Sequence, residues 1–230
     1  MANIENNTTS VQRRLQQAAR DAGRNPEDIL LLAVSKTRTS AQVRVAVDSG
    51  LSSFGENYLQ EALEKMDQLT DLSISWHFIG PLQSNKTRQV AEHFDWIHTV
   101  DRLKIAKRLS DQRPADMAPL NICLQINIDN EPSKSGFMPQ QAIEAASSIA
   151  GLPSLRLRGL MAIPKPSTEL AQQRQPFVRL RALLEQINER LDNSQKLDTL
   201  SMGMSGDLEP AIYEGATIIR VGTDIFGPRS

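Results

Sequence analysis

The sequence predicts a closed (β/α)8 TIM barrel, and three observations lead to this fold class. Short apolar runs alternate with amphipathic stretches along the chain, and eight of these runs have the length of strands. Alternating strands and helices imply a parallel sheet with right-handed crossovers. The chain has 230 residues, a length at which eight units favour a closed barrel over an open doubly wound sheet. No linker or change in composition divides the chain, so we expect one domain over residues 1–230.

The elements follow in order along the chain. An extra N-terminal helix is expected over residues 11–23, and Pro26 separates it from the first strand because proline cannot continue a helix. The run ILLLAVS (residues 29–35) is almost entirely apolar, as expected of a strand covered on both faces. The other strands are expected at residues 53–56, 75–80, 95–99, 121–128, 155–162, 199–202 and 217–221. Helices are expected around residues 40–49, 58–69, 85–93, 101–112, 140–150 and 171–191, with a short one after Gly206.

Composition and charge exclude several classes of protein. Lys and Arg total 26 against 27 for Asp and Glu, so no basic excess points to nucleic acid or a membrane surface. No apolar run approaches the roughly 18 residues of a membrane span, and the polar first ten residues do not resemble a signal peptide. The single cysteine, Cys123, lies in an apolar run and is expected to be buried and inert. We expect a cytoplasmic protein.

In a β/α barrel the chemistry lies at the carboxyl ends of the strands. Lys36 follows the first apolar strand, where partial desolvation favours the neutral amine. A neutral amine is what Schiff-base formation with an aldehyde requires. On this feature alone, a solvated loop lysine remains the more common interpretation.

Two loops rich in small residues follow the last two expected strands. They are SMGMSG (residues 201–206) and RVGT (residues 220–223), and barrels often build a phosphate site from these two loops. Ordinary turn chemistry is the alternative. Arg220 should point inward, and a buried arginine needs an acceptor. The pyridine nitrogen of pyridoxal 5′-phosphate (PLP) is one candidate, and a structural carboxylate is the other.

The three histidines, His77, His93 and His98, have no metal-site spacing, and no Ser–His–Asp order stands out. We therefore predict no metal site and no hydrolase triad.

Several motifs occur together in one order. They are AVSKT (33–37), FGENY (54–58), WHFIGPLQSNK (76–86), RGLM (158–161) and LSMGMS (200–205). With them the chain closely resembles the pyridoxal phosphate homeostasis protein family over about residues 11–227. The resemblance implies a fold-type III PLP barrel, similar to the N-terminal domain of alanine racemase.

The resemblance also implies roles for individual residues. Lys36 looks like the Schiff-base lysine, carrying N6-(pyridoxal phosphate)lysine, and Arg220 looks like the partner of the pyridine nitrogen. The other cofactor-binding positions are Ser205, Gly222 and Thr223 at the phosphate, with Ser201 nearby, and Asn57, His77 and Met161 around the ring. No catalytic residue is assigned. An arginine on the ring nitrogen makes the cofactor a poorer electron sink than an aspartate would.

The family is associated with PLP and vitamin B6 balance, holding PLP and supplying apo-enzymes, with no settled catalytic activity. No sequence for a racemase-type second domain follows Gly227, so we expect an open cofactor face and a monomer. Some members have a lysine-rich tail, whereas this chain ends FGPRS. Lys134 is offered as a second amine that could accept PLP, with an exposed loop lysine as the alternative. A PLP-dependent racemase or decarboxylase, and a phosphate-binding barrel enzyme without PLP, remain open.

Overall fold

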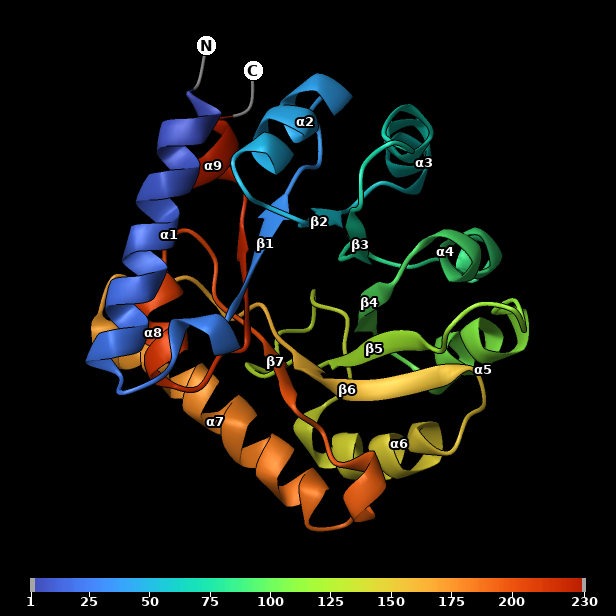
Figure 1. The fold of residues 1–230 in the computed structure, drawn as a ribbon. Helices are drawn as coiled ribbons and strands as arrows, with labels where there is room; N and C mark the ends of the chain where they lie inside the picture. Colours follow the sequence, from blue (N-terminus) through green and yellow to red (C-terminus); the bar gives the residue numbers. More distant parts are fainter. Residues whose placement is uncertain (1–2, 229–230) are drawn as a thin grey trace.

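The computed structural model describes residues 3–228 and confirms the predicted fold (Figure 1). Eight parallel strands form a closed barrel in the order of the sequence, and β8 pairs with β1 to close it. The strands are β1 Leu30–Val34, β2 Ser53–Glu56, β3 Ser75–Phe78, β4 Trp96–Val100, β5 Leu120–Gln125, β6 Leu155–Met161, β7 Thr199–Ser201 and β8 Ile218–Val221.

Helices connect the strands and form the outer layer. They are α1 Ile4–Asp21, α2 Ser40–Asp48, α3 Leu59–Gln68, α4 Thr87–His93, α5 Leu103–Gln112, α6 Pro139–Ala150, α7 Leu170–Asn188, α8 Leu208–Tyr213 and α9 Thr223–Phe226, with short 3-10 turns at Pro26–Asp28 and Asn193–Gln195. Apolar side chains from the outer face of the strands and the inner faces of these helices form the main core. Among residues 3–228, no helix is both long and apolar enough to cross a membrane.

The N-terminal helix begins earlier than the sequence pattern indicated. The side chain of Asn3 accepts a hydrogen bond from the backbone nitrogen of Asn6 and caps the helix at Ile4. Ile4 is buried on the same face as Val11 and Leu15, so the apolar stripe extends through the polar first turns. Helix α1 (blue) lies beside α8 and α9 (red) in Figure 1, which brings the two ends of the described chain together.

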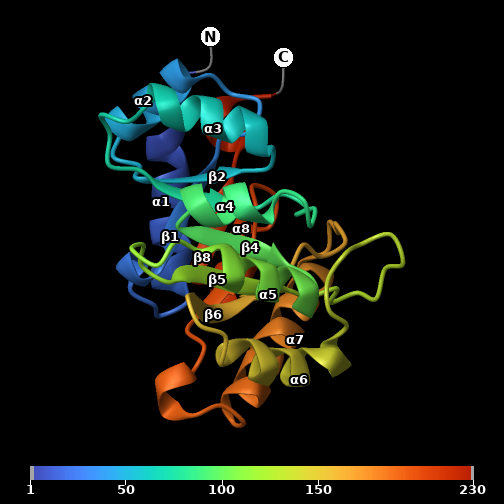
Figure 2. The ribbon, with the colours of Figure 1, turned by 90° about the vertical axis from the view of Figure 1, so that its right-hand side faces the viewer.

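One loop lies where the sequence pattern predicted strand residues. Strand β5 ends at Gln125, although the apolar run continues to Ile128. The side chain of Asn127 donates to the carbonyl oxygens of Glu131 and Lys134, which ties these residues into a loop instead. That loop (yellow-green) and the segment after β6 (orange) extend away from the strands on one side of the molecule in Figure 2. Helix α9, directly after the RVG loop, was not predicted.

Candidate functional site

A cavity of about 280 Å³ lies at the carboxyl ends of the strands. Its walls come from the ends of β1, β2, β3, β6, β7 and β8 or from the loops that follow them, which is where barrel chemistry is expected. The predicted residues that line it are Lys36, Asn57, Met161, Ser205, Arg220, Gly222 and Thr223. The lining residues that sequence reasoning did not name as site residues are Val34, Ile79, Ile163, Met204 and Gly206.

Two of the nine predicted cofactor-binding residues do not line this cavity. Ser201 and His77 are fully buried in the barrel interior. Ser201 reaches the cavity through a hydrogen bond from Arg220, whereas His77 lies further along the same interior. The structure therefore brings Lys36 together with the loops after β7 and β8, and separates His77 from them.

A buried ion pair holds the backbone before Lys36. The carboxylate of Glu56, at the end of β2, accepts hydrogen bonds of 2.6 Å from the hydroxyl of Ser35 and from Nζ of Lys65. Lys65 also donates to the carbonyl oxygen of Ser35 at 2.6 Å. Burial raises the pKa of Glu56, and the positive charge and hydrogen bond of Lys65 offset part of that effect. Ser35 is thus fixed through both its side chain and its backbone.

The backbone after Lys36 is held as well. The backbone nitrogen of Thr37 donates to Glu61 at 2.6 Å, and Glu61 also pairs with Lys65. Thr37 has a φ of 62°, a left-handed conformation that threonine adopts at a cost of about 1–3 kcal/mol. These contacts on both flanks position Lys36 at the rim, and they were not predicted.

The loops after β7 and β8 form the part of the wall next to the first strand, because β8 pairs with β1. Gly203 has a φ of 92°, and a Cβ there would overlap the side chain of Ala211, so only glycine fits this turn. The carbonyl oxygen of Ser205 accepts a hydrogen bond from Arg14, whose guanidinium also pairs with Glu209 and Asp224. Helix α1 therefore anchors the loop after β7 to α8 and to the start of α9.

Arg220 enters the cavity from β8 with its side chain almost fully buried. Its guanidinium donates to Ser201 Oγ at 2.7 Å and to the carbonyl oxygen of Ala162 at 2.9 Å. Burial lowers the pKa of Arg220 to about 10, so it remains protonated at neutral pH. Within residues 3–228 no carboxylate forms a direct ion pair with it, although the charge of Asp207 acts on it and partly offsets the effect of burial on its pKa, so a buried positive charge lies at the cavity wall.

Asn57 supplies an unsatisfied acceptor. Its side-chain oxygen is buried and has no hydrogen-bond partner among the described residues, and Asn57 itself is one of the residues that line the cavity. A Cβ on Gly80 would overlap the backbone carbonyl of Asn57, so glycine lets the loop after β3 pack against this residue. This close packing accounts for the glycine of the WHFIGPLQSNK motif.

Lys134 lies beside the cavity rather than in its lining. Its Nζ pairs with Glu131 at 2.6 Å and donates to the carbonyl oxygen of Ile163 at 3.0 Å. Ile163 is one of the wall residues, so this amine borders the site.

Cys123 is fully buried, as predicted. Burial raises the pKa of its thiol to about 12, so the thiol is protonated and unreactive at neutral pH.

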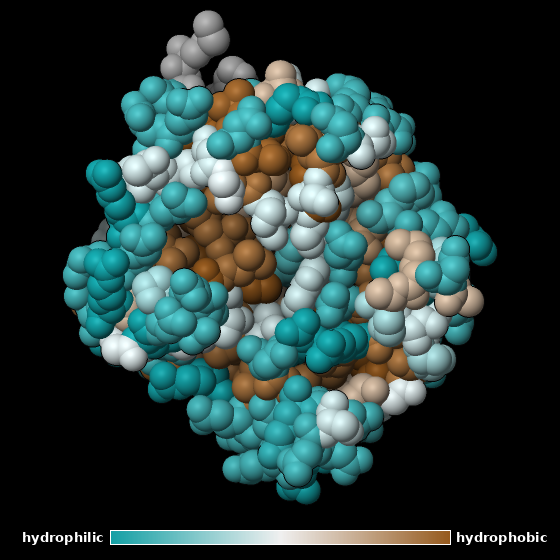
Figure 3. All heavy atoms as spheres, viewed as in Figure 1, coloured by the Kyte–Doolittle hydropathy of each residue, from teal (hydrophilic) through white to brown (hydrophobic). Residues whose placement is uncertain are grey.

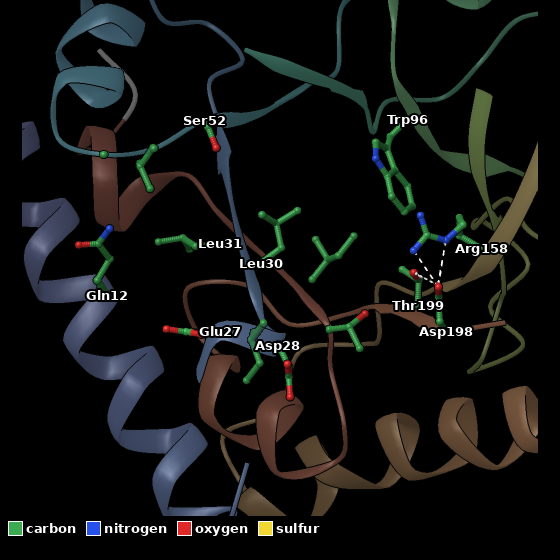
Figure 4. Close-up of a pocket in the computed structure, with 15 residues that line it drawn as sticks. Gln12, Glu27, Asp28, Leu30, Leu31, Ser52, Trp96, Arg158, Asp198 and Thr199 are labelled. Carbon is green, nitrogen blue, oxygen red and sulfur yellow. Dashed lines mark hydrogen bonds and ion pairs between the residues drawn. The ribbon is translucent and has the colours of Figure 1, made fainter. Parts of the chain in front are cut away.

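A larger cavity, of about 600 Å³, lies where the strands begin (Figure 4). Its arginine already has a partner: Arg158 pairs with Asp198 and lies 4.9 Å from the Trp96 ring centroid. The face shown in Figure 3 carries apolar atoms near its centre, surrounded by hydrophilic ones. Among the described residues of its lining there is no lysine, and the one arginine, Arg158, is already paired, so this cavity lacks the amine and the unpaired cation of the smaller one.

The smaller cavity fits PLP. It combines a lysine amine for an aldehyde, a buried guanidinium, glycine and hydroxyl groups suited to a phosphate, and the unsatisfied Asn57 oxygen. Apolar side chains, among them Val34 and Ile79, supply surfaces for an aromatic ring.

The chain is similar to several known proteins. The family model of the alanine racemase N-terminal domain matches residues 3–230. The pyridoxal phosphate homeostasis protein of Pseudomonas aeruginosa is 58% identical over 229 residues, covering 100% of this chain and 97% of that protein.

Two solved structures are also similar. The structure of PipY from Synechococcus elongatus with PLP bound has 37% identity and a TM-score of 0.82, covering 93% of this chain and 99% of that one. Alanine racemase from Corynebacterium glutamicum shares the fold, with 19% identity and a TM-score of 0.69, covering 98% of this chain and 60% of the racemase. The chain therefore belongs to the alanine racemase N-terminal domain family, and within it to the group of pyridoxal phosphate homeostasis proteins.

Proposed function

We propose that this protein binds PLP covalently through Lys36 and takes part in PLP homeostasis by holding and releasing the cofactor. The observation that carries the proposal is the meeting of Lys36, Arg220 and the loops after β7 and β8 around one cavity. The names of the relatives and the PLP-bound PipY structure support it.

Each group has a defined task in this proposal. The Lys36 amine adds to the cofactor's aldehyde carbon, and one water molecule leaves as the carbon–nitrogen double bond forms. Ser205, Gly222 and Thr223 bind the phosphate, Asn57 and Met161 lie at the ring, and Arg220 donates to the ring nitrogen. PLP supplies electron withdrawal when bound, but an arginine donor keeps its ring nitrogen unprotonated and weakens that withdrawal. This favours a carrier over a racemase or decarboxylase.

The attachment is tested by borohydride reduction of the PLP-loaded protein followed by peptide mass spectrometry. Reduction should fix the label on Lys36, and Lys36→Arg should abolish it while keeping the positive charge. Lys104→Ala, on the exposed face of α5, is the matched control and should leave labelling unchanged. A label that persists at full yield in Lys36→Arg would refute the proposal. A minor label on Lys134 would identify it as the second amine.

The carrier role requires two further measurements. Sustained racemisation or CO2 release from amino acids, lost in Lys36→Arg, would instead establish an enzyme. Mixing loaded protein with an apo-PLP enzyme tests supply, and activation no faster than with free PLP at the same free concentration counts against direct delivery. We also propose a cytoplasmic monomer, which size-exclusion chromatography with light scattering and cell fractionation would check.

A further inference from the structure

A line of five polar groups runs through the barrel interior from the cavity wall. Arg220 Nη1 lies 2.7 Å from Ser201 Oγ, which lies 2.7 Å from Nδ1 of His98. Nε2 of His98 lies 2.9 Å from Nδ1 of His77, and Nε2 of His77 lies 3.3 Å from Ser75 Oγ. These groups come from β8, β7, β4 and β3, so the line crosses the barrel.

The first member fixes the direction of the first hydrogen bond, and the rest of the line follows once Ser201 gives its own proton to His98. A guanidinium has N–H donors and no acceptor, so Ser201 must accept from Arg220. The Ser201 hydroxyl then has its own proton to give, and the neighbouring acceptor is Nδ1 of His98. With Nδ1 accepting, a neutral His98 carries its proton on Nε2 and donates to Nδ1 of His77. His77 in turn carries its proton on Nε2, facing Ser75.

Both imidazoles lie where the neutral form is favoured. His77 and His98 are buried to within 1% of complete, and Trp96 stacks on His77 with ring centroids 5.4 Å apart. Burial lowers the pKa of His77 to about 3, and burial together with the charges of His77 and Arg220 lowers that of His98. A protonated His98 would direct an N–H at a hydroxyl that already accepts from Arg220. It would also place a second cation near the guanidinium.

We infer that His98 is a positioning residue for Arg220, acting through Ser201. This inference rests on the proposed function, in which Arg220 faces the cofactor's ring nitrogen. Ser201 and the carbonyl of Ala162 take hydrogen bonds from two different guanidinium nitrogens, which fixes the plane of the group. The remaining N–H groups are then available to the cavity. Without an acceptor at position 98, the Ser201 hydroxyl is free to rotate and the plane of Arg220 is held less firmly.

The direction of the line is tested first in the cofactor-free protein. Long-range 1H–15N NMR of the imidazole rings distinguishes the tautomers, with assignments taken from His98→Gln and His77→Gln. Both rings should be neutral Nε2–H tautomers that do not titrate between about pH 5 and 8. A proton on Nδ1 of His98, or titration of His98 in that range, would overturn the inference without reference to PLP.

The positioning role is tested with paired variants. His98→Phe removes the acceptor, and PLP binding should weaken by about tenfold, the loss expected from one net hydrogen bond. His98→Gln offers an amide oxygen to Ser201 and an amide N–H to His77, so affinity should return to within a few-fold of wild type. Ile97→Val, a buried change on the same strand outside the line, controls for general loosening of β4.

The outcomes separate this inference from the proposed function. Equal weakening in the Phe and Gln variants, or an effect of His98→Phe no larger than that of Ile97→Val, would reject a positioning role. Should His98→Phe not fold, the NMR measurement on the wild-type chain still decides the direction of the line. If PLP proved not to attach to Lys36, the proposed function would fail while the tautomers remained as inferred.

Discussion

The side-chain nitrogen of Lys65 lies 2.6 Å from the carbonyl oxygen of Ser35, the residue immediately before Lys36. The same nitrogen also contacts the carboxylates of Glu56 and Glu61. Helix α3 therefore reaches across to the first strand and holds the backbone from which the proposed PLP-binding amine projects. A residue outside the cavity lining thus holds the backbone next to that amine.

Lys65→Met should unfold more easily than wild type, because it leaves the Glu56 carboxylate buried without its cation. The expected loss in the free energy of unfolding is about 3–5 kcal/mol at neutral pH, measured by urea denaturation. Lowering the pH should restore part of the loss, since an unpaired buried carboxylate takes up a proton. Adding Glu56→Gln to Lys65→Met should also restore stability, because it removes the unpaired carboxylate. As a control, Arg44→Ala removes the exposed ion pair with Asp71 and should change the free energy of unfolding little. Equal losses in the single and double variants would contradict this account.

Stability should fall as the pH is lowered below about 6.5, the usual pKa of histidine. The folded-state pKa of His77 is lowered to about 3, so below 6.5 the unfolded chain binds protons that the folded chain does not. His98 has the same sign. Each histidine lowers the free energy of unfolding by up to about 1.4 kcal/mol for each unit that the pH falls. This loss is complete once the pH falls below the folded-state pKa of that histidine. Unfolding free energies at several pH values would show it, and His98→Gln should reduce the slope.

Asn57→Ala should separate cofactor binding from stability. Because the Asn57 oxygen is buried without a partner, its removal should leave the unfolding free energy unchanged or slightly higher. PLP affinity should nonetheless fall, as the cavity loses its unsatisfied acceptor. Spectrophotometric titration with PLP and thermal unfolding of the cofactor-free protein measure the two effects. An unchanged PLP affinity would show that Asn57 does not contact the cofactor.

Arg14→Ala should weaken PLP binding although α1 lies outside the cavity lining. Arg14 contacts the Ser205 carbonyl, Glu209 and Asp224, and its loss releases the loop after β7 from the start of α9. The pairs are partly exposed, so the stability loss should be below about 1 kcal/mol and smaller at high salt. Arg13→Ala, on the exposed side of the same helix, is the control. Equal PLP affinity in the Arg14→Ala and Arg13→Ala variants would show that the loops after β7 and β8 do not need Arg14 to hold their positions.

The rim of the site was predictable because a barrel places every strand end at the same edge. Lys36, Arg220, Gly222 and Thr223 were therefore expected near one another from strand boundaries alone, and the structure places them around one cavity. His77 shows the limit of this reasoning. Side chains along a strand alternate between faces, so His77 and Ile79 both face inward, but Ile79 reaches the cavity and His77 lies one layer deeper.

The support beneath Lys36 could not be predicted in the same way. Lys65 lies in EALEKMDQ, a stretch with the composition of an exposed helix, and its burial depends on Glu56 from a neighbouring strand. The spacing of Glu61 and Lys65 was a readable signal for a pair on one helix face, but not for its contact with Ser35. Such contacts depend on tertiary packing, which strand and helix patterns leave undetermined.

The pairing of β1 with β8 has a consequence for biosynthesis. During translation Lys36 leaves the ribosome early, whereas Arg220, Gly222 and Thr223 emerge after nearly all of the barrel has been made. Under the proposed function, a nascent chain therefore exposes the Lys36 amine for most of its synthesis without the groups that would select a phosphorylated aldehyde. On that proposal, selective capture of the cofactor begins only when the last strand docks against the first, so a loaded protein would also be one whose folding has been completed.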